Sequence, residues 1–118
     1  PKGRNRLSMI YARLCLELSN QGYSVVCATI SNFPGCRSWN RSNIKRYCEI
    51  YVQVPMNILQ KRDSKGLYDK AKRGELSNVI GVDIPFIEPE SPNITIENTG
   101  DLNPRKIVDK IISEISNV

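Results

Sequence analysis

The spacing of hydrophobic residues near the start of the chain predicts an amphipathic helix. Between positions 7 and 20 these residues recur in steps of three and one, at Leu7, Ile10, Tyr11, Leu14, Cys15 and Leu18. Such spacing gathers the side chains into one apolar stripe on a helix. Gly22 follows at a position where glycine commonly ends a helix. We therefore expect a helix over 7–20.

Three further stretches are typical of β-strands. The sequence at 23–30, YSVVCATI, is a continuous apolar and β-branched run, which is typical of a strand buried on both faces of a parallel sheet. A second strand is predicted at 47–54 and a third at 93–99. Strands that alternate with helices indicate an α/β fold with a mainly parallel sheet.

The remaining helices are predicted between and after these strands. Residues 36–46 form a short, basic, polar stretch, and Pro55 suits the first turn of a helix over 55–62. Asn103 is a good capping residue ahead of Pro104. The final helix has an apolar stripe at Ile107, Val108, Ile111, Ile112 and Ile115.

In parallel sheets, ligands bind beyond the carboxyl ends of the strands. This rule indicates three candidate ligand-binding segments, which are the loop at 31–35, the segment after Val54 and the loop after Thr99. The segment 61–92 is irregular and carries six Lys/Arg and six Asp/Glu residues, with three prolines and three glycines. Such a segment is either a solvated loop or a mobile element that closes over a ligand.

Composition narrows the classes of ligand. The formal charge of +5 suits a nucleotide, phosphate or sulfate, and also weak nonspecific nucleic-acid binding, although no nucleic-acid-binding motif is present. Four cysteines without a CxxC pair, and no histidine, exclude a Cys/His zinc site. We expect reduced thiols in a cytoplasmic protein. No apolar run approaches the ~20 residues of a membrane span.

Three stretches of the sequence carry a family resemblance. They are CATISNF, YVQVPMNILQKRDSKGLYDKAKRGELSNVIGVD and PFIEPESPNITIENTG. Together they resemble the carboxyl half of adenylylsulfate kinases, the P-loop enzymes that phosphorylate the 3′-hydroxyl of adenylyl sulfate in sulfate assimilation. The resemblance implies a P-loop-containing nucleoside triphosphate hydrolase-like fold, which has three α/β/α layers and a mainly parallel sheet. It also implies ATP and Mg²⁺, one domain over 1–118, and a homodimer, which is common in the family.

The resemblance identifies the irregular segment as a lid over the nucleotides, with the lid and the loop after it spanning 62–92. It implies that Lys65, Gly66, Leu67 and Tyr68 contact substrate and that Lys65 has a catalytic role. A closing lid suits phosphoryl transfer, because water must be excluded and the acceptor held in line. Arg62 resembles the family's basic residue near ATP, where a guanidinium can stack on adenine.

The acceptor side is implied by residues earlier in the chain. Arg4 aligns with an arginine that grips the acceptor's phosphosulfate, while Ile30, Ser31 and Phe33 match the family's Ile-Ser-Pro-Phe. Phe33 would stack on the acceptor's adenine. Ser31 occupies the position of a proposed phosphoserine intermediate; because the chain has no histidine to activate it, we expect it to hydrogen-bond substrate instead.

The sequence departs from the family on this acceptor side. Leu7, Ser8, Met9 and Ile10 replace the family's Asn-Ile-Arg-Arg, and Asn32 and Pro34 flank Phe33. We therefore expect ATP as the donor but a different acceptor, such as an activated nucleotide-linked intermediate of surface-polysaccharide modification.

No Walker A loop, GxxxxGK[ST], occurs in the 118 residues. We therefore expect them to be the carboxyl two-thirds of a kinase, with the Mg²⁺ ligands in the amino-terminal part, and to be inactive alone. The alternative is a P-loop-less module that binds nucleotide without catalysis.

Overall fold

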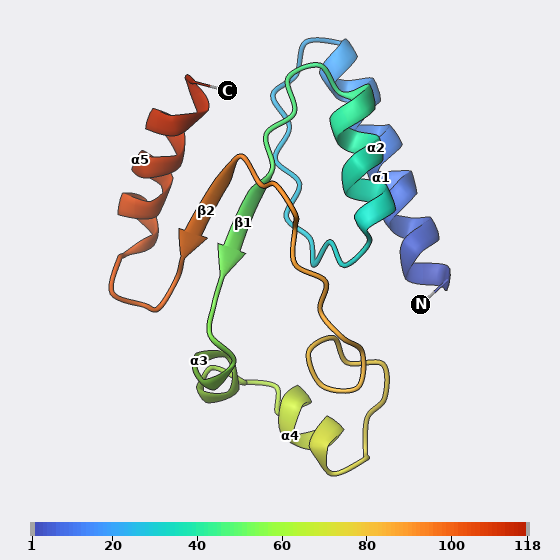
Figure 1. Cartoon of the computed structure of the whole chain (residues 1–118), viewed down its shortest axis with the longest axis vertical. Coiled ribbons are helices and arrows are strands. Elements are labelled where there is room, and N and C mark those ends of the chain that lie inside the picture. Colours follow the sequence, from blue (N-terminus) through green and yellow to red (C-terminus); the bar gives the residue numbers. More distant parts are fainter. Residues whose placement is uncertain (1, 118) are drawn as a thin grey trace. The chain divides into compact units, whose positions relative to one another are not determined.

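The chain forms two compact units that meet in sequence at Tyr47 and Cys48. The computed structural model describes residues 2–117 (Figure 1). The first unit contains α1 (Lys2–Asn20) and α2 (Pro34–Asn43). The second unit contains β1 (Ile50–Gln53), α3 (Met56–Lys61), α4 (Leu67–Lys72), β2 (Ile94–Glu97) and α5 (Pro104–Ile115).

Helix α1 ends at Asn20, and Gly22 follows just beyond it at the capping position that the sequence predicts. Gly22 has a φ of +89°, in the left-handed region that glycine adopts without strain. The Tyr23 N–H donates to the Leu18 carbonyl at 3.1 Å, and the Gly22 N–H donates to Ser19 at 3.0 Å. These two bonds satisfy the last carbonyl groups of the helix in a Schellman arrangement.

Helices α1 and α2 lie side by side and pack against each other (Figure 1). The contact includes the Cys36 thiol, which donates to the Ser8 carbonyl at 3.6 Å, and Cys36 itself is buried. Ala12, one turn on from Ser8, is also buried. The predicted apolar stripe lies on another face, and Ile10 and Leu14 are 52% and 53% exposed. The sequence therefore predicts the helix correctly but not the face that packs on α2.

The strand predicted at 23–30 is wrong for the described residues. This segment has no regular secondary structure, and Val26 and Ile30 are 96% and 70% exposed rather than buried. A strand requires hydrogen bonds to a neighbouring strand. Within residues 2–117 the sheet contains only β1 and β2, so 23–30 has no place in it.

The other two strands form the parallel pair that the sequence predicts. Ile50 of β1 pairs with Ile94 of β2, and the register continues to Gln53 and Glu97. Ile94 and Ile96 are 3% and 2% exposed, while the residues between and after them are exposed. This alternation shows that β2 buries only one of its faces.

Several element boundaries differ from the prediction. Helix α2 begins at Pro34, because proline suits the first helical position, and ends at Asn43. Pro55 is the residue before α3 rather than part of its first turn. Helix α4 was not predicted, since six residues are too few for a periodic pattern. No helix among residues 2–117 is long and apolar enough to cross a membrane.

Helix α5 begins with the predicted cap and contacts β2. The Asn103 side-chain oxygen accepts from the Lys106 N–H at 2.9 Å. Ile107 and Ile111 of its apolar stripe are half-buried, while Val108, Ile112 and Ile115 are exposed.

We predict that Asn103→Ala lowers the free energy of unfolding by about 1 kcal/mol, because the Lys106 N–H loses its acceptor. Asn103→Asp keeps an acceptor oxygen and is the matched control. Urea unfolding of the three proteins measures the difference. Equal losses in the two variants would contradict the capping role.

Candidate functional site

Parallel pairing places the ends of β1 and β2 at the same edge of the sheet, and the segments that follow them meet there. Arg62 follows α3, and Gly100 lies in the loop after β2. A Cβ atom added to Gly100 would lie 2.9 Å from Nη2 of Arg62, and the φ of Gly100 is +96°. The Arg62 guanidinium therefore lies against the loop after β2, at the edge where ligands bind in parallel sheets.

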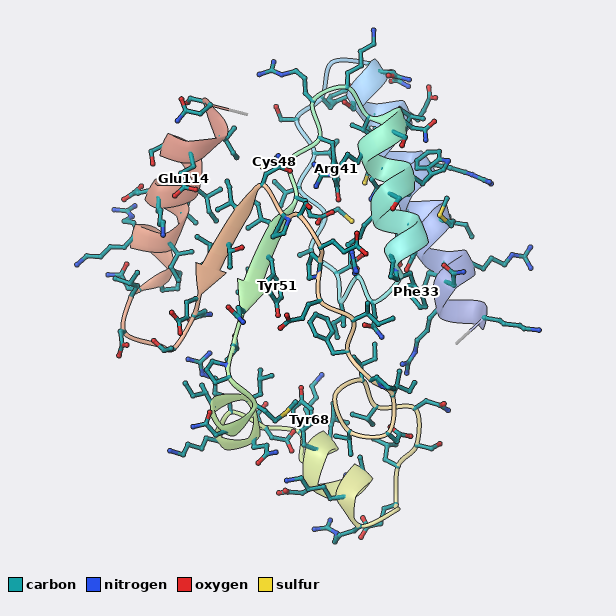
Figure 2. All side chains as sticks on the ribbon, viewed as in Figure 1. Phe33, Arg41, Cys48, Tyr51, Tyr68 and Glu114 are labelled. Atoms are coloured by element: carbon teal, nitrogen blue, oxygen red, sulfur yellow. The ribbon has the colours of Figure 1, made fainter. Side chains whose placement is uncertain are left out.

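The four predicted lid residues are consecutive at the start of α4. Gly66 has a φ of +62° and precedes the first helical residue. Lys65 is exposed and Leu67 is 43% exposed, while Tyr68, which is labelled in Figure 2, is half-buried. The structure thus brings a cation, a flexible glycine and two apolar side chains together at one end of a short helix.

Asp63 holds this end of α4, and sequence reasoning missed it. Its Oδ1 accepts from the Leu67 N–H at 2.8 Å, and its Oδ2 accepts from Tyr68 and Asp69 at 3.0 and 3.4 Å. The first N–H groups of a helix have no partner within the helix. An aspartate shortly before a helix is the signal that could have identified this cap.

A second carboxylate, Asp83, holds the turn at the far end of the lid. It accepts from the N–H groups of Asn78 and Val79, both at 2.6 Å, and Asn78 has a φ of +62°. Desolvation alone would raise the pKa of Asp83, but the backbone N–H donors outweigh it and hold that pKa below its ordinary value. The folded turn therefore favours the ionised carboxylate.

The return of the chain from the lid is attached to β1 through Tyr51. The Tyr51 ring stacks on Phe86, with centroids 6.0 Å apart and an interplanar angle of 26°. Its hydroxyl donates to Glu88 at 3.2 Å. Desolvation, followed by the bond to Glu88, raises the pKa of Tyr51. Phe86 remains 41% exposed, so one aromatic surface beside the sheet is accessible.

The predicted acceptor residues lie in the first unit. Ser31 and Phe33 share the loop before α2, with Phe33 directly ahead of its first residue (Figure 2). Arg37 is buried, and its Nη1 donates to the Ser31 carbonyl, which fixes this loop to α2. Ile30 is largely exposed, and Arg4 is exposed on α1.

Comparison with known proteins identifies the family. The model of the family described as adenylylsulphate kinase matches residues 2–97. The chain belongs to the adenylylsulphate kinase family. Members of this family are kinases that use ATP.

Relatives of two kinds are similar to the chain. A cytidine diphosphoramidate kinase of Campylobacter jejuni is 38% identical over 115 residues, which are 98% of this chain and 67% of that protein. An adenylyl-sulfate kinase of Clostridium acetobutylicum is 44% identical over 95 residues, covering 80% of this chain and 47% of that kinase. A probable adenylyl-sulfate kinase of Archaeoglobus fulgidus is 35% identical over 93 residues, or 79% of this chain and 58% of that protein. The chain thus spans between about half and two thirds of these relatives.

The predicted family residues fall into two sets. Arg4, Ile30, Ser31 and Phe33 belong to the first unit, and Arg62 and 65–68 belong to the second. In the first unit Arg37 anchors Ser31, and in the second unit Asp63 anchors the backbone of Leu67 and Tyr68. Residues 2–117 contain no cluster of three His, Cys, Asp or Glu side chains suited to a metal ion, and we assign no Mg²⁺ ligand among them.

We predict that Asp83→Asn weakens the turn at 78–84 near neutral pH but not in acid. Because the folded pKa of Asp83 is lowered, its stabilising effect is present above the unfolded value of about 3.9 and is lost as the pH falls through the folded value. Hydrogen-exchange protection of the Asn78 and Val79 N–H groups measures the effect. Asp109→Asn on α5 is the control, and a difference between Asp83 and Asn that persists at the lowest pH would contradict the assignment.

Proposed function

We propose that the protein is a kinase that transfers the γ-phosphoryl group of ATP to a hydroxyl of a nucleotide-linked acceptor. We further propose that this acceptor is cytidine diphosphoramidate, or a close relative of it, rather than adenylyl sulfate. The observation that carries the choice is the match to the cytidine diphosphoramidate kinase over 98% of the chain, whereas six adenylyl-sulfate kinases match over 65–86% of it.

Local sequence supports the same choice of acceptor. The departures from the adenylyl-sulfate kinase pattern lie at 7–10 and 32–34, in the first unit with the expected acceptor residues. The lid sequence in the second unit keeps the family pattern. A donor side that keeps the family pattern and an acceptor side that departs from it are what a change of acceptor with ATP kept as the donor would produce.

The chemistry of the second unit supports ATP as the donor. Arg62 lies against the loop after β2, where its planar guanidinium can cover a purine base. Lys65 is exposed at the start of α4 and offers a positive charge to a phosphate group. In the reaction the acceptor hydroxyl attacks the γ-phosphorus, ADP leaves, and the hydroxyl proton is released to base or solvent.

Whole-protein kinetics test this acceptor choice. We predict a kcat/KM for cytidine diphosphoramidate at least about tenfold above that for adenylyl sulfate, a difference of about 1.4 kcal/mol. The experiment uses the protein as its cell makes it, with γ-labelled ATP. Its intact mass and amino-terminal sequence are determined alongside, to locate any GxxxxGK[ST] loop.

A preference for adenylyl sulfate would overturn the proposed acceptor but keep the kinase. ATP binding without transfer to either acceptor would favour a nucleotide-binding module.

We also predict that Lys65→Ala lowers kcat/KM for ATP roughly tenfold to a hundredfold, because a charge-assisted bond contributes about 1.5–3 kcal/mol. Its melting temperature should barely change, since Lys65 is exposed. Lys70→Ala removes the same charge from an exposed position on α4 and is the matched control. A large loss of stability with normal kinetics would refute the lid role of Lys65.

A further inference from the structure

We infer that Asp63 is a positioning residue that holds the lid in the conformation required for nucleotide binding. The inference rests on the proposed function, because it assigns Asp63 a role at the same site. Asp63 acts through Lys65, Leu67 and Tyr68 rather than by touching substrate itself.

The backbone at the start of α4 is hydrogen-bonded to the Asp63 carboxylate. The two oxygens of Asp63 accept three successive N–H groups, from Leu67, Tyr68 and Asp69, at 2.8–3.4 Å. The Asp63 carbonyl also accepts from the Gly66 N–H at 3.1 Å. Lys65 and Gly66 therefore lie in a short loop that begins at Asp63 and is closed by the hydrogen bonds from Asp63 to the start of α4.

Helix α4 depends on this carboxylate because little else stabilises it. It has six residues, none of them buried, and its capping position is Gly66, which has no side chain to accept a hydrogen bond. Isolated helices shorter than ~12 residues are marginal in water, because nucleation is costly. Removing the Asp63 carboxylate leaves three N–H groups without their acceptor, so the start of α4 should fray.

Fraying at this point affects binding more than overall stability. The side chains expected to contact nucleotide are those of the first helical turn and of Lys65 just before it. If these residues are disordered before binding, the free energy needed to order them reduces the affinity for nucleotide. The segment is mostly exposed, so its local opening is separate from global unfolding.

An electrostatic role for Asp63 predicts the opposite result from a positioning role. A carboxylate near phosphate groups repels them, so removal of its charge alone would strengthen nucleotide binding. Positioning requires acceptor oxygens, and asparagine retains one of the two. An activity that is highest in the wild type, lower in Asp63→Asn and lowest in Asp63→Ala therefore identifies a positioning role.

The test compares Asp63→Asn, Asp63→Ala and Asp69→Ala in the whole protein. Asp69 supplies the same charge on the same exposed helix, but its carboxylate does not take part in the Asp63 loop. We expect Asp63→Ala to lower kcat/KM for ATP about tenfold or more, Asp63→Asn to be intermediate, and Asp69→Ala to match the wild type. Hydrogen exchange at the Leu67 and Tyr68 N–H groups should accelerate in the same order, with melting temperatures nearly unchanged.

Two results would overturn the inference. One is normal kinetics in Asp63→Ala; the other is an equal loss in Asp63→Ala and Asp69→Ala. If the wild type phosphorylates neither acceptor, the proposed function fails, and ATP affinity then tests the lid by itself. Several-fold weaker ATP binding in Asp63→Ala than in Asp69→Ala supports positioning, and equal affinities refute it.

Discussion

The parallel pairing of β1 (Ile50–Gln53) with β2 (Ile94–Glu97) is the constraint on which the second unit depends. Because both strands run the same way, the chain leaves them at one edge of the sheet, although more than forty positions separate them. The buried face of β2, at Ile94 and Ile96, fixes this register, since a slip of one residue would expose both side chains. The proximity of Arg62 and Gly100 follows from the pairing.

The segment between the two strands keeps its form through carboxylates rather than through a core. Asp63 holds the start of α4, and Asp83 holds the turn at 78–84. Both bind successive backbone N–H groups, which is how Asp and Asn side chains commonly order irregular chain. The predicted lid segment is thus ordered locally and remains mostly exposed, as the proposed opening and closing around a ligand would require.

The sequence predicts well those features that depend on local interactions. The glycine end of α1, the Asn103 cap and the positions of the two strands follow from residue types that act within a few positions of one another. The failure at 23–30 has the opposite cause. An apolar run indicates that a segment can be buried, but a strand needs a partner, and residues 2–117 contain none for it.

The candidate site shows the same difference between features set by local sequence and features set by contacts distant in the sequence. The family resemblance predicts the Lys65–Tyr68 stretch, whereas Asp63 and Arg37 were not singled out, because their roles come from backbone groups that they reach in space. Similarly, the apolar stripe of α1 is real, but α2 packs beside Ser8 and Ala12 instead. Small side chains allow a close helix approach that hydrophobic periodicity does not reveal.

The residues that keep the family pattern and those that depart from it lie in different units of the chain. The lid and Arg62 occupy one unit, and Ser31, Phe33 and Arg37 occupy the other. In the first unit Arg37 holds the Ser31 carbonyl, which anchors the loop that contains Asn32 and Pro34 to α2. Under the proposed function, this anchored loop belongs to the acceptor side. The departures at 7–10 and 32–34 would then change which acceptor is bound, while the donor side would still use ATP.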